Sequence, residues 1–135
     1  MTETWKPVPE WETLYEVSDL GRVRSLDRLV RQKTRSGNWH MQPYYSKVLT
    51  PRTGGGRKKG DRYRLVSLAK DNRPVNAYIH HLVAAAFLGP KPKGTEINHK
   101  DCDKTNNALS NLEYVSRGEN IAHALANGKG RWCSS

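Results

Sequence analysis

One histidine and two asparagines near the C-terminal end are of the types that metal-assisted phosphodiester hydrolysis requires. Such a reaction needs a base for the attacking water and a Lewis acid on the scissile phosphate. His99 is the best candidate for the base, because an imidazole titrates near neutral pH. Asn98 and Asn120 offer amide oxygens to one divalent ion, and oxygen ligands favour Mg²⁺ or Mn²⁺ over Zn²⁺.

The residues between these asparagines predict a strand, a loop and a second strand. The letters "EINH" favour a short strand, "KDCDKTNN" a polar loop and "NLEYVS" a second strand. We interpret Asn106 and Asn107 as turn formers, because asparagine tolerates the backbone angles of tight turns. His99 then lies at the end of the first strand, next to the loop.

A helix with a clear start follows the second strand. Ser116 and Glu119 form a capping box at its beginning, and Asn127–Gly128 marks its end. Asn120 falls in the first turn, where it can face the strand that carries the candidate base. His123 lies three residues further on the same side. We expect it to act as an additional metal ligand or phosphate contact, or to be a plain surface histidine.

The N-terminal half has the pattern of antiparallel strands. "WETLYEVSDLGRVRSLDRLV" predicts two strands joined by a turn at residues 18–21, with Val23 facing away from the neighbouring arginines. "YRLVSLAK" and "PVNAYI" predict two more strands, and "HHLVAAAFLG" predicts a helix that ends at Gly89. Residues 31–46 form a polar segment. "TPRTGGGRKKGD" is a flexible basic loop without the GK[ST] ending of a phosphate-binding P-loop.

Positive charge is concentrated in the first part of the chain. Residues 1–77 hold 16 Lys and Arg against 8 Asp and Glu, and residues 78–135 hold 7 against 5. A solvated surface usually mixes the two signs, so we favour a surface that neutralises phosphates. Membrane binding fits less well, because no amphipathic basic helix accompanies the charge. The pattern therefore indicates nucleic acid as the partner.

Two groups of cations are the candidate DNA contacts. Arg22, Arg24 and Arg28 have even spacing, so on one continuous strand they would emerge on one face. The glycine-rich loop adds three more, which would wrap the DNA backbone: Arg57, Lys58 and Lys59.

Composition excludes several other classes of protein. The chain has 135 residues and 36% hydrophobic residues, enough for one domain or for two small lobes that share a core. No apolar run approaches the roughly 18 residues of a membrane span, and the N-terminus does not resemble a signal peptide. Two cysteines cannot form a four-thiolate zinc site, and an isolated pair favours a reducing, intracellular setting.

Several motifs together resemble a known family. "NH" at 98–99, "NNALSNLEYVS" and "RGEN" are similar to the His-Asn-His (HNH) nuclease motif, a ββα-metal fold. "IHHLVAAAFLGPKP" resembles the segment that precedes this motif in phage homing endonucleases. "WETLYEVSDLGRVRSLDR" resembles their NUMOD-type DNA-binding module. The resemblance implies an α+β protein with an antiparallel β lobe over residues 1–74 and an HNH domain over residues 75–135.

The resemblance also implies roles for single residues. Asn111 matches the middle asparagine of the family name, which pins the loop that carries the base. Many relatives have aspartate where this chain has Asn98, and a neutral amide binds Mg²⁺ more weakly than a carboxylate. His81 stands where relatives often have arginine. It is a candidate phosphate contact, or else it packs or caps at the helix start.

Two classes of function remain open. The first is a metal-dependent endonuclease that nicks or cuts double-stranded DNA, encoded by a phage and acting in the host cytoplasm. The second is a DNA-binding regulator or packaging accessory on the same scaffold, without nuclease activity. The combination of Asn98, His99 and Asn120 favours the enzyme, because a pure binder does not need it. Neither a membrane nor an obligate protein partner is indicated, and an RNA-binding module is disfavoured because no RNP-like aromatic strand is present.

Overall fold

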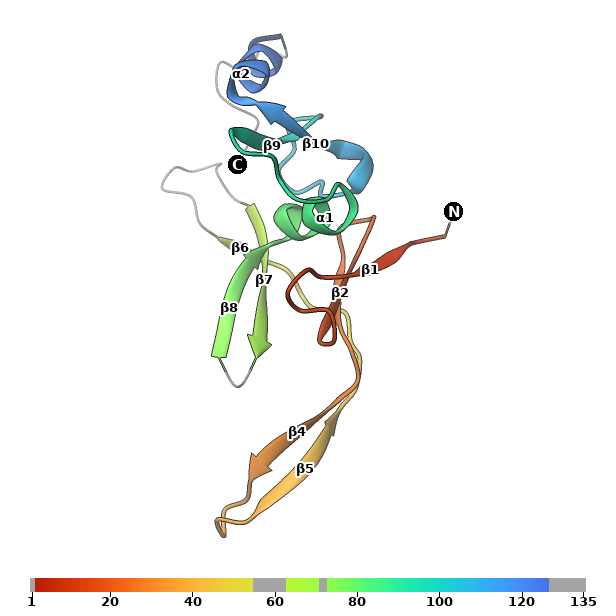
Figure 1. Ribbon diagram of the computed structural model, residues 1–135, viewed down its shortest axis with the longest axis vertical. Helices are drawn as coiled ribbons and strands as arrows, with labels where there is room; N and C mark the ends of the chain where they lie inside the picture. Colours follow the sequence, from red (N-terminus) through yellow and green to blue (C-terminus); the bar gives the residue numbers. More distant parts are fainter. Residues whose placement is uncertain (1, 55–62, 71–72, 127–135) are drawn as a thin grey trace.

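The protein is built mainly from antiparallel strands (Figure 1), as a computed structural model shows for residues 2–54, 63–70 and 73–126. Within the second helix, the side chains of residues 120, 123 and 124 are also outside the description. The elements in chain order are β1 (Trp5–Pro7), β2 (Tyr15–Ser18), β3 (Val23–Ser25), β4 (Arg28–Lys33), β5 (Trp39–Tyr44), β6 (Arg52–Gly54), β7 (Tyr63–Lys70), β8 (Arg73–Tyr78), α1 (Ile79–Phe87), β9 (Thr95–His99), the 3-10 turn η1 (Leu109–Asn111), β10 (Leu112–Ser116) and α2 (Arg117–Ala126).

The strands of the described residues form four small sheets. Their orders are β1-β2-β3, β4-β5, β6-β7-β8 and β9-β10. Every pairing between neighbouring strands is antiparallel. This arrangement of antiparallel sheets with separate helices confirms the predicted α+β class.

The predicted N-terminal strand pair is confirmed, with its turn at residues 18–21. β2 and β3 pair with Val17 opposite Val23, and both valines are buried. The hydroxyl of Ser18 accepts hydrogen bonds from the backbone N–H groups of Leu20 and Arg22. Gly21 completes the turn with a φ of +86°, a conformation that favours glycine.

The segment 31–46, for which the sequence indicated only a polar character, forms most of a β-ribbon. β4 and β5 pair along their whole length, from Arg28 opposite Tyr44 to Lys33 opposite Trp39. Gly37, at φ +89°, lies in the turn between them. In Figure 1 this ribbon extends away from the rest of the molecule. Every residue of β5 is exposed, so this strand buries no face against the core.

One hydrophobic cluster joins the N-terminal sheet, β7, α1 and the β9–β10 hairpin. Its buried members are Val8, Tyr15, Val17, Val23, Val66, Leu68, Ile79, Val83, Ala84, Ile97 and Leu112. The predicted helix is confirmed as α1, and Gly89 follows it at φ +84°. No helix in the described part of the chain combines the length and apolarity needed to cross a bilayer.

A backbone contact connects the first turn with the loop that follows β9. The N–H of Leu109 donates to the carbonyl of Asp19 at 2.8 Å. Gly21 lies close to the same loop, since a Cβ at this position would be 2.9 Å from the carbonyl oxygen of Asn107. Residues about ninety positions apart in the chain therefore touch through backbone atoms, and little space for a side chain is left between them.

We predict that Gly21→Ala destabilises the fold more than Gly94→Ala does. Both glycines have positive φ, at +86° and +80°, but a Cβ at Gly94 would meet no atom within 4 Å. Both variants carry the backbone strain of an alanine in this region, about 1–3 kcal/mol, and only Gly21→Ala adds a clash with Asn107. Urea unfolding of the two variants measures the difference. Equal losses of stability would show that the loop near Asn107 moves aside without cost.

Candidate functional site

The β9–β10 hairpin and α2 position the predicted site. β9 ends at His99, and its register places Asn98 opposite Glu113 and His99 opposite Leu112. Asn98 and His99 are both fully buried. The predicted capping box is confirmed: the N–H of Glu119 donates to the Ser116 hydroxyl at 3.2 Å, and the N–H of Ser116 donates to the Glu119 carboxylate at 3.4 Å.

His99 is oriented by an asparagine that we had interpreted as a turn former. Its Nε2 lies 2.9 Å from Oδ1 of Asn107, which is itself buried. Because an amide oxygen only accepts hydrogen bonds, Nε2 must carry the ring proton, and Nδ1 keeps a lone pair. Nδ1 is buried and has no hydrogen-bond partner among the described residues. The ring is thus held in the tautomer that leaves one nitrogen able to accept a proton.

Burial has the largest effect on the protonation of His99. It lowers the pKa of His99, and the hydrogen bond from Nε2 to Asn107 and the nearby Asp101 only partly oppose this effect. The positive charge of Lys104 lowers the pKa of His99 further. The imidazole is therefore neutral near neutral pH, the form in which it can act as a base.

Asn98 presents one buried polar atom without a partner. Its Nδ2 donates to Oε1 of Glu113 at 2.8 Å. Its Oδ1 is buried and has no hydrogen-bond partner among the described residues. Leaving a buried acceptor unpaired costs about 1–3 kcal/mol, so an oxygen in this state fits a ligand for a cation.

Asn111, the last residue of η1, ties this turn to the loop after β9. Its Oδ1 accepts from the N–H of Asp101 at 3.0 Å, and its Nδ2 donates to Oδ1 of Asp101 and to the carbonyl of Asn106, both at 2.8 Å. The backbone N–H of Lys100 also donates to the carbonyl of Asn111 at 2.8 Å. These bonds hold both ends of the loop that follows the candidate base.

Two predicted ligands cannot be located at the level of side chains. Asn120 and His123 belong to α2, which packs against β9 and β10, but their side chains lie outside the described residues. The described part of the chain contains no group of three His, Cys, Asp or Glu that could hold a metal ion. The two asparagines suggested by the sequence, Asn98 and Asn120, are amides and do not count toward such a group.

Cys102, in the loop after β9, differs from expectation. It is disulfide-bonded, whereas we expected a reduced pair of cysteines. Cys133 falls outside the described residues. Cys102 also has a φ of +61°.

A cluster of imidazole and phenol rings lies behind His99. His80 is fully buried on α1, and its ring centroid lies 5.1 Å from those of His99 and Tyr63. His81 packs edge-on against His80 at 4.4 Å and is itself exposed. The structure thus places His81 on the surface at the start of α1, where it packs against His80 and stays accessible to solvent.

We predict that His80 makes the fold sensitive to acid. Burial, with smaller contributions from His81 and His99, lowers the pKa of His80 to about 2. In the unfolded chain a histidine titrates near 6.5. Below that pH the imidazole of His80 therefore binds a proton in the unfolded state but not in the folded state. The contribution of neutral His80 to the free energy of unfolding is complete above about pH 6.5. Below that pH it falls by up to about 1.4 kcal/mol per pH unit.

The pH dependence of unfolding in His80→Phe measures this contribution. Urea unfolding at pH 7.5, 6.0 and 5.0 should give a shallower decline for the variant than for the parent chain. The matched control is His40→Phe, which replaces an exposed histidine of β5 outside this ring cluster. Tyr63, Tyr78, His81 and His99 face His80 and are unchanged in both variants. Parallel slopes for parent and His80→Phe would contradict the prediction.

The three arginines proposed as one DNA-binding face do not share a strand. Arg22 precedes β3 and pairs with Glu3, Arg24 lies in β3, and Arg28 begins β4. The expectation of one continuous strand was wrong because the chain leaves β3 after Ser25 and starts a separate ribbon.

Each of these arginines also has a partner within the protein. Arg22 pairs with Glu3, and Arg24 donates to Glu16 at 2.6 Å and lies over the ring of Trp5. Arg28 donates to the carbonyl of Ala69 at 3.4 Å. Arg57, Lys58 and Lys59 lie outside the described residues.

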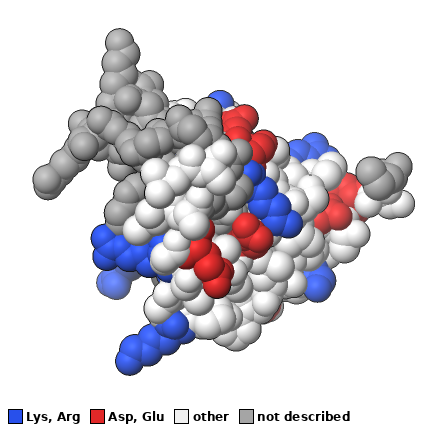
Figure 2. Space-filling view, turned by 90° about the horizontal axis from the view of Figure 1, so that it is seen from above, with Lys and Arg blue, Asp and Glu red and all other residues white. Residues whose placement is uncertain are grey.

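Charges are distributed unequally between the two ends of the molecule. Seen from the α2 end, the surface carries both basic and acidic side chains (Figure 2). The ribbon at the opposite end contains Arg28, Arg31, Lys33 and Arg35, and residues 28–45 include no Asp or Glu. Trp39 lies beneath two of these cations, 4.5 Å from Arg31 and 5.9 Å from Lys33. The sequence pointed to the basic segment but not to this ribbon.

Two family models match this chain. Residues 3–50 match the NUMOD4 motif, and residues 77–122 match the model described as HNH endonuclease. These two segments are the ones that the sequence motifs had indicated, in the same order.

Individual proteins and a solved structure are similar over most of the chain. An uncharacterized HNH endonuclease of Acanthamoeba polyphaga mimivirus is 32% identical over 95% of this chain and 32% of the relative. The DNA endonuclease I-HmuI of Bacillus phage SP01 is 27% identical over 92% of this chain and 59% of that protein. A solved structure of DNA binding and cleavage by the HNH homing endonuclease I-HmuI matches with a TM-score of 0.69 and 27% identity, covering 93% of this chain and 60% of that one. This chain is thus shorter than each of these relatives, and it spans about a third of the viral one.

Proposed function

We infer that this chain, in which a NUMOD4 motif is followed by an HNH endonuclease segment, belongs with the HNH homing endonucleases of the phage type. From this premise we propose that it is a metal-dependent DNA endonuclease. It hydrolyses phosphodiester bonds of double-stranded DNA and acts in the cytoplasm of a bacterial host. The observation that carries the proposal is the pair of unpartnered atoms on adjacent residues, Nδ1 of His99 and Oδ1 of Asn98.

His99 is the proposed general base. Its Nε2–H is held by Asn107 at 2.9 Å, so Nδ1 is the atom that takes the proton from the attacking water. Burial keeps the ring neutral before this step, since it lowers the pKa of His99. Asn107 and Asn111 are positioning residues: the first fixes the tautomer, and the second fixes the loop that carries the first.

Asn98 is the proposed anchor of one divalent ion, Mg²⁺ or Mn²⁺, with Asn120 and His123 as further ligands from α2. Oδ1 of Asn98 fits this role because it is buried and unpartnered among the described residues. When bound, the ion would act as a Lewis acid on the scissile phosphate. The neutral amide set favours a weakly held, hydrated ion over a structural metal.

The β4–β5 ribbon is the proposed main DNA contact. A two-stranded ribbon fits the major groove of B-DNA, and the ribbon of this chain carries cations without acids. At its base, a groove is lined by three cations, Arg28, Arg31 and Lys70. We keep Arg57, Lys58, Lys59 and His81 as proposed phosphate contacts. Arg22 and Arg24 contribute less, because their charges are already paired with carboxylates.

A plasmid-nicking assay tests the proposal. Supercoiled plasmid incubated with the protein should become nicked or linear with Mg²⁺ or Mn²⁺, and should stay intact with a chelator. The alternative, a DNA-binding protein without nuclease activity, would shift the plasmid on a gel and leave it supercoiled under every metal condition. That result would overturn the proposed activity while keeping DNA as the partner.

A further inference from the structure

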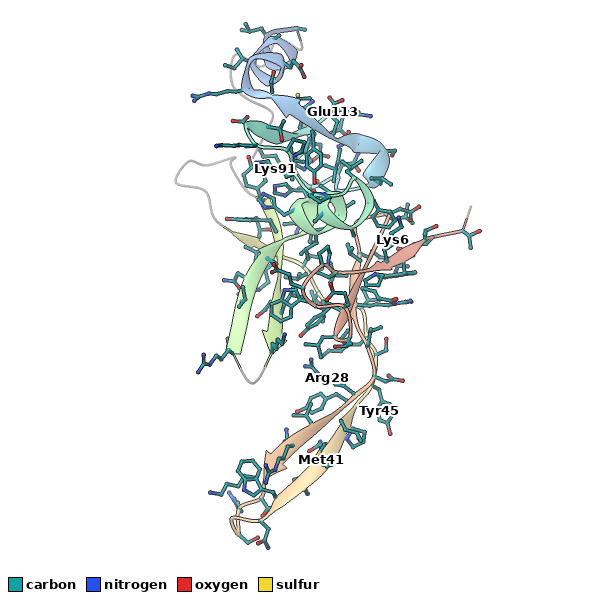
Figure 3. All side chains as sticks on the ribbon, viewed as in Figure 1. Lys6, Arg28, Met41, Tyr45, Lys91 and Glu113 are labelled. Atoms are coloured by element: carbon teal, nitrogen blue, oxygen red, sulfur yellow. The ribbon has the colours of Figure 1, made fainter. Side chains whose placement is uncertain are left out.

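The candidate metal ligand Asn98 has a carboxylate partner directly across the hairpin. The register of β9 and β10 places Glu113 opposite Asn98, and Nδ2 of Asn98 donates to Oε1 of Glu113 at 2.8 Å. Asn98 is fully buried, whereas Glu113 is partly exposed on β10. Figure 3 labels Glu113 on this hairpin, far from the ribbon that carries Met41 and Tyr45.

This hydrogen bond determines whether the oxygen or the nitrogen of the Asn98 amide faces the proposed ion site. A carboxylate accepts hydrogen bonds and cannot donate them when ionised, so Glu113 selects the amide orientation in which Nδ2 faces the carboxylate. The oxygen must then point elsewhere, and Oδ1 is the buried atom without a partner among the described residues. If the amide were free to rotate, either its nitrogen or its oxygen would face this position, and only the oxygen can bind a cation.

The same carboxylate adds charge next to neutral ligands. An amide oxygen binds a divalent ion without compensating its charge, and attraction to a nearby negative group makes up for part of this deficit. Outer-shell partners that orient a metal ligand typically change metal affinity about 10–100-fold when they are removed.

We propose that Glu113 is a positioning residue of the divalent-ion site, which holds the oxygen of Asn98 toward the ion and supplies a negative charge beside it. The inference rests on the proposed function, since it assumes that Asn98 is a ligand. It assigns to Glu113 a role that differs from that of an ordinary cross-strand hydrogen bond. An ordinary bond would contribute to the stability of the hairpin and would leave metal affinity unchanged.

Binding of Mn²⁺ to the free protein separates these two roles. Electron paramagnetic resonance of unbound Mn²⁺ gives the affinity without any cleavage assay. Glu113→Ala, which loses both the hydrogen bond and the charge, should weaken Mn²⁺ binding about 10-fold or more. Glu113→Gln keeps an acceptor for Nδ2 but loses the charge, so its loss should be smaller. Glu96→Gln is the matched control, because it removes the same charge two residue pairs further along the same face of the hairpin.

Exchanging the two groups provides a second test. Asn98→Asp alone would place two carboxylates against each other and should lower the unfolding midpoint without metal, with Mn²⁺ raising it again. The double variant Asn98→Asp, Glu113→Gln restores one donor and one acceptor with the parental net charge. It should recover both the unfolding midpoint and Mn²⁺ affinity at or above that of the parent.

Three results would overturn the inference. They are a parent chain that binds no Mn²⁺ in the free state, a Glu113→Ala variant with parental Mn²⁺ affinity, and a Glu96→Gln variant that loses as much affinity as Glu113→Gln. Plasmid cleavage by the parent chain is measured in parallel. Metal-dependent cleavage together with any of these results would reject the role of Glu113 alone, and absence of cleavage would reject the proposed function.

Discussion

Replacing His99 with alanine is expected to slow plasmid cleavage by about 10²–10⁴-fold, the usual contribution of a general base. The variant loses Nδ1, the ring nitrogen left free to accept a proton when Nε2 donates to Asn107. DNA affinity should change little, because the ring is fully buried and a base that acts on water contributes little to phosphate binding. The measurement is the nicking rate at saturating protein, with binding measured separately in chelator.

Asn107 supplies the control for orientation. Asn107→Ala leaves the base in place but removes the acceptor that fixes its tautomer, so it should slow cleavage less than His99→Ala does. Asn107→Asp keeps an oxygen acceptor for Nε2 and should recover part of the rate. If His99→Ala cleaves at the parental rate, His99 is not the base, and the assignment of this site must be abandoned.

Local patterns in the sequence were sufficient to predict the elements around the site. Ser116 and Glu119 form the predicted capping box because its two hydrogen bonds involve residues only three positions apart. Val17 and Val23 pair across the predicted turn because a turn of fixed length determines the register. Asn98 and His99 could be placed for a similar reason, since the predicted short strand ends at these two residues.

Partners of single side chains could not be predicted. Asparagine serves as a turn former and as a hydrogen-bond acceptor, and nothing in the sequence separates Asn106 from Asn107. The structure shows that Asn107 is the partner of His99. The partnership of Asn98 with Glu113 likewise depends on the hairpin register, which fixes which residues face each other.

The sequence did not predict the ion pairs of Arg22 and Arg24 or the β4–β5 ribbon, for related reasons. Arg22 and Arg24 were expected to face DNA, but Glu3, which precedes β1, and Glu16, in β2, pair with them. A charge count along the chain does not detect such pairs. The β4–β5 ribbon was not predicted because strand prediction relies on one buried face, and exposed residues alternate in β4 only with half-buried ones.

The electrostatic part of DNA binding is therefore expected to depend on the ribbon. The double variant Arg31→Gln, Lys33→Gln removes two cations from the outward face of β4. Each phosphate contact contributes about −0.9 to the slope of log K against log salt, so the slope should become shallower by about 2. At about 0.1 M salt the same loss corresponds to a weakening of about 10²-fold.

The double variant Arg22→Gln, Arg24→Gln is the matched control, with the same number of charges removed from the same lobe. Because both arginines are already paired with carboxylates, their removal releases fewer counterions, and the slope should change by less than about 1. Binding constants are measured across a salt series in chelator, and circular dichroism checks that both variants keep the parental fold. Equal changes of slope would mean that the internal ion pairs open on DNA and that the ribbon has no special role. A parental slope in the ribbon variant would place the DNA on another surface, because Arg31 and Lys33 would then release no counterions.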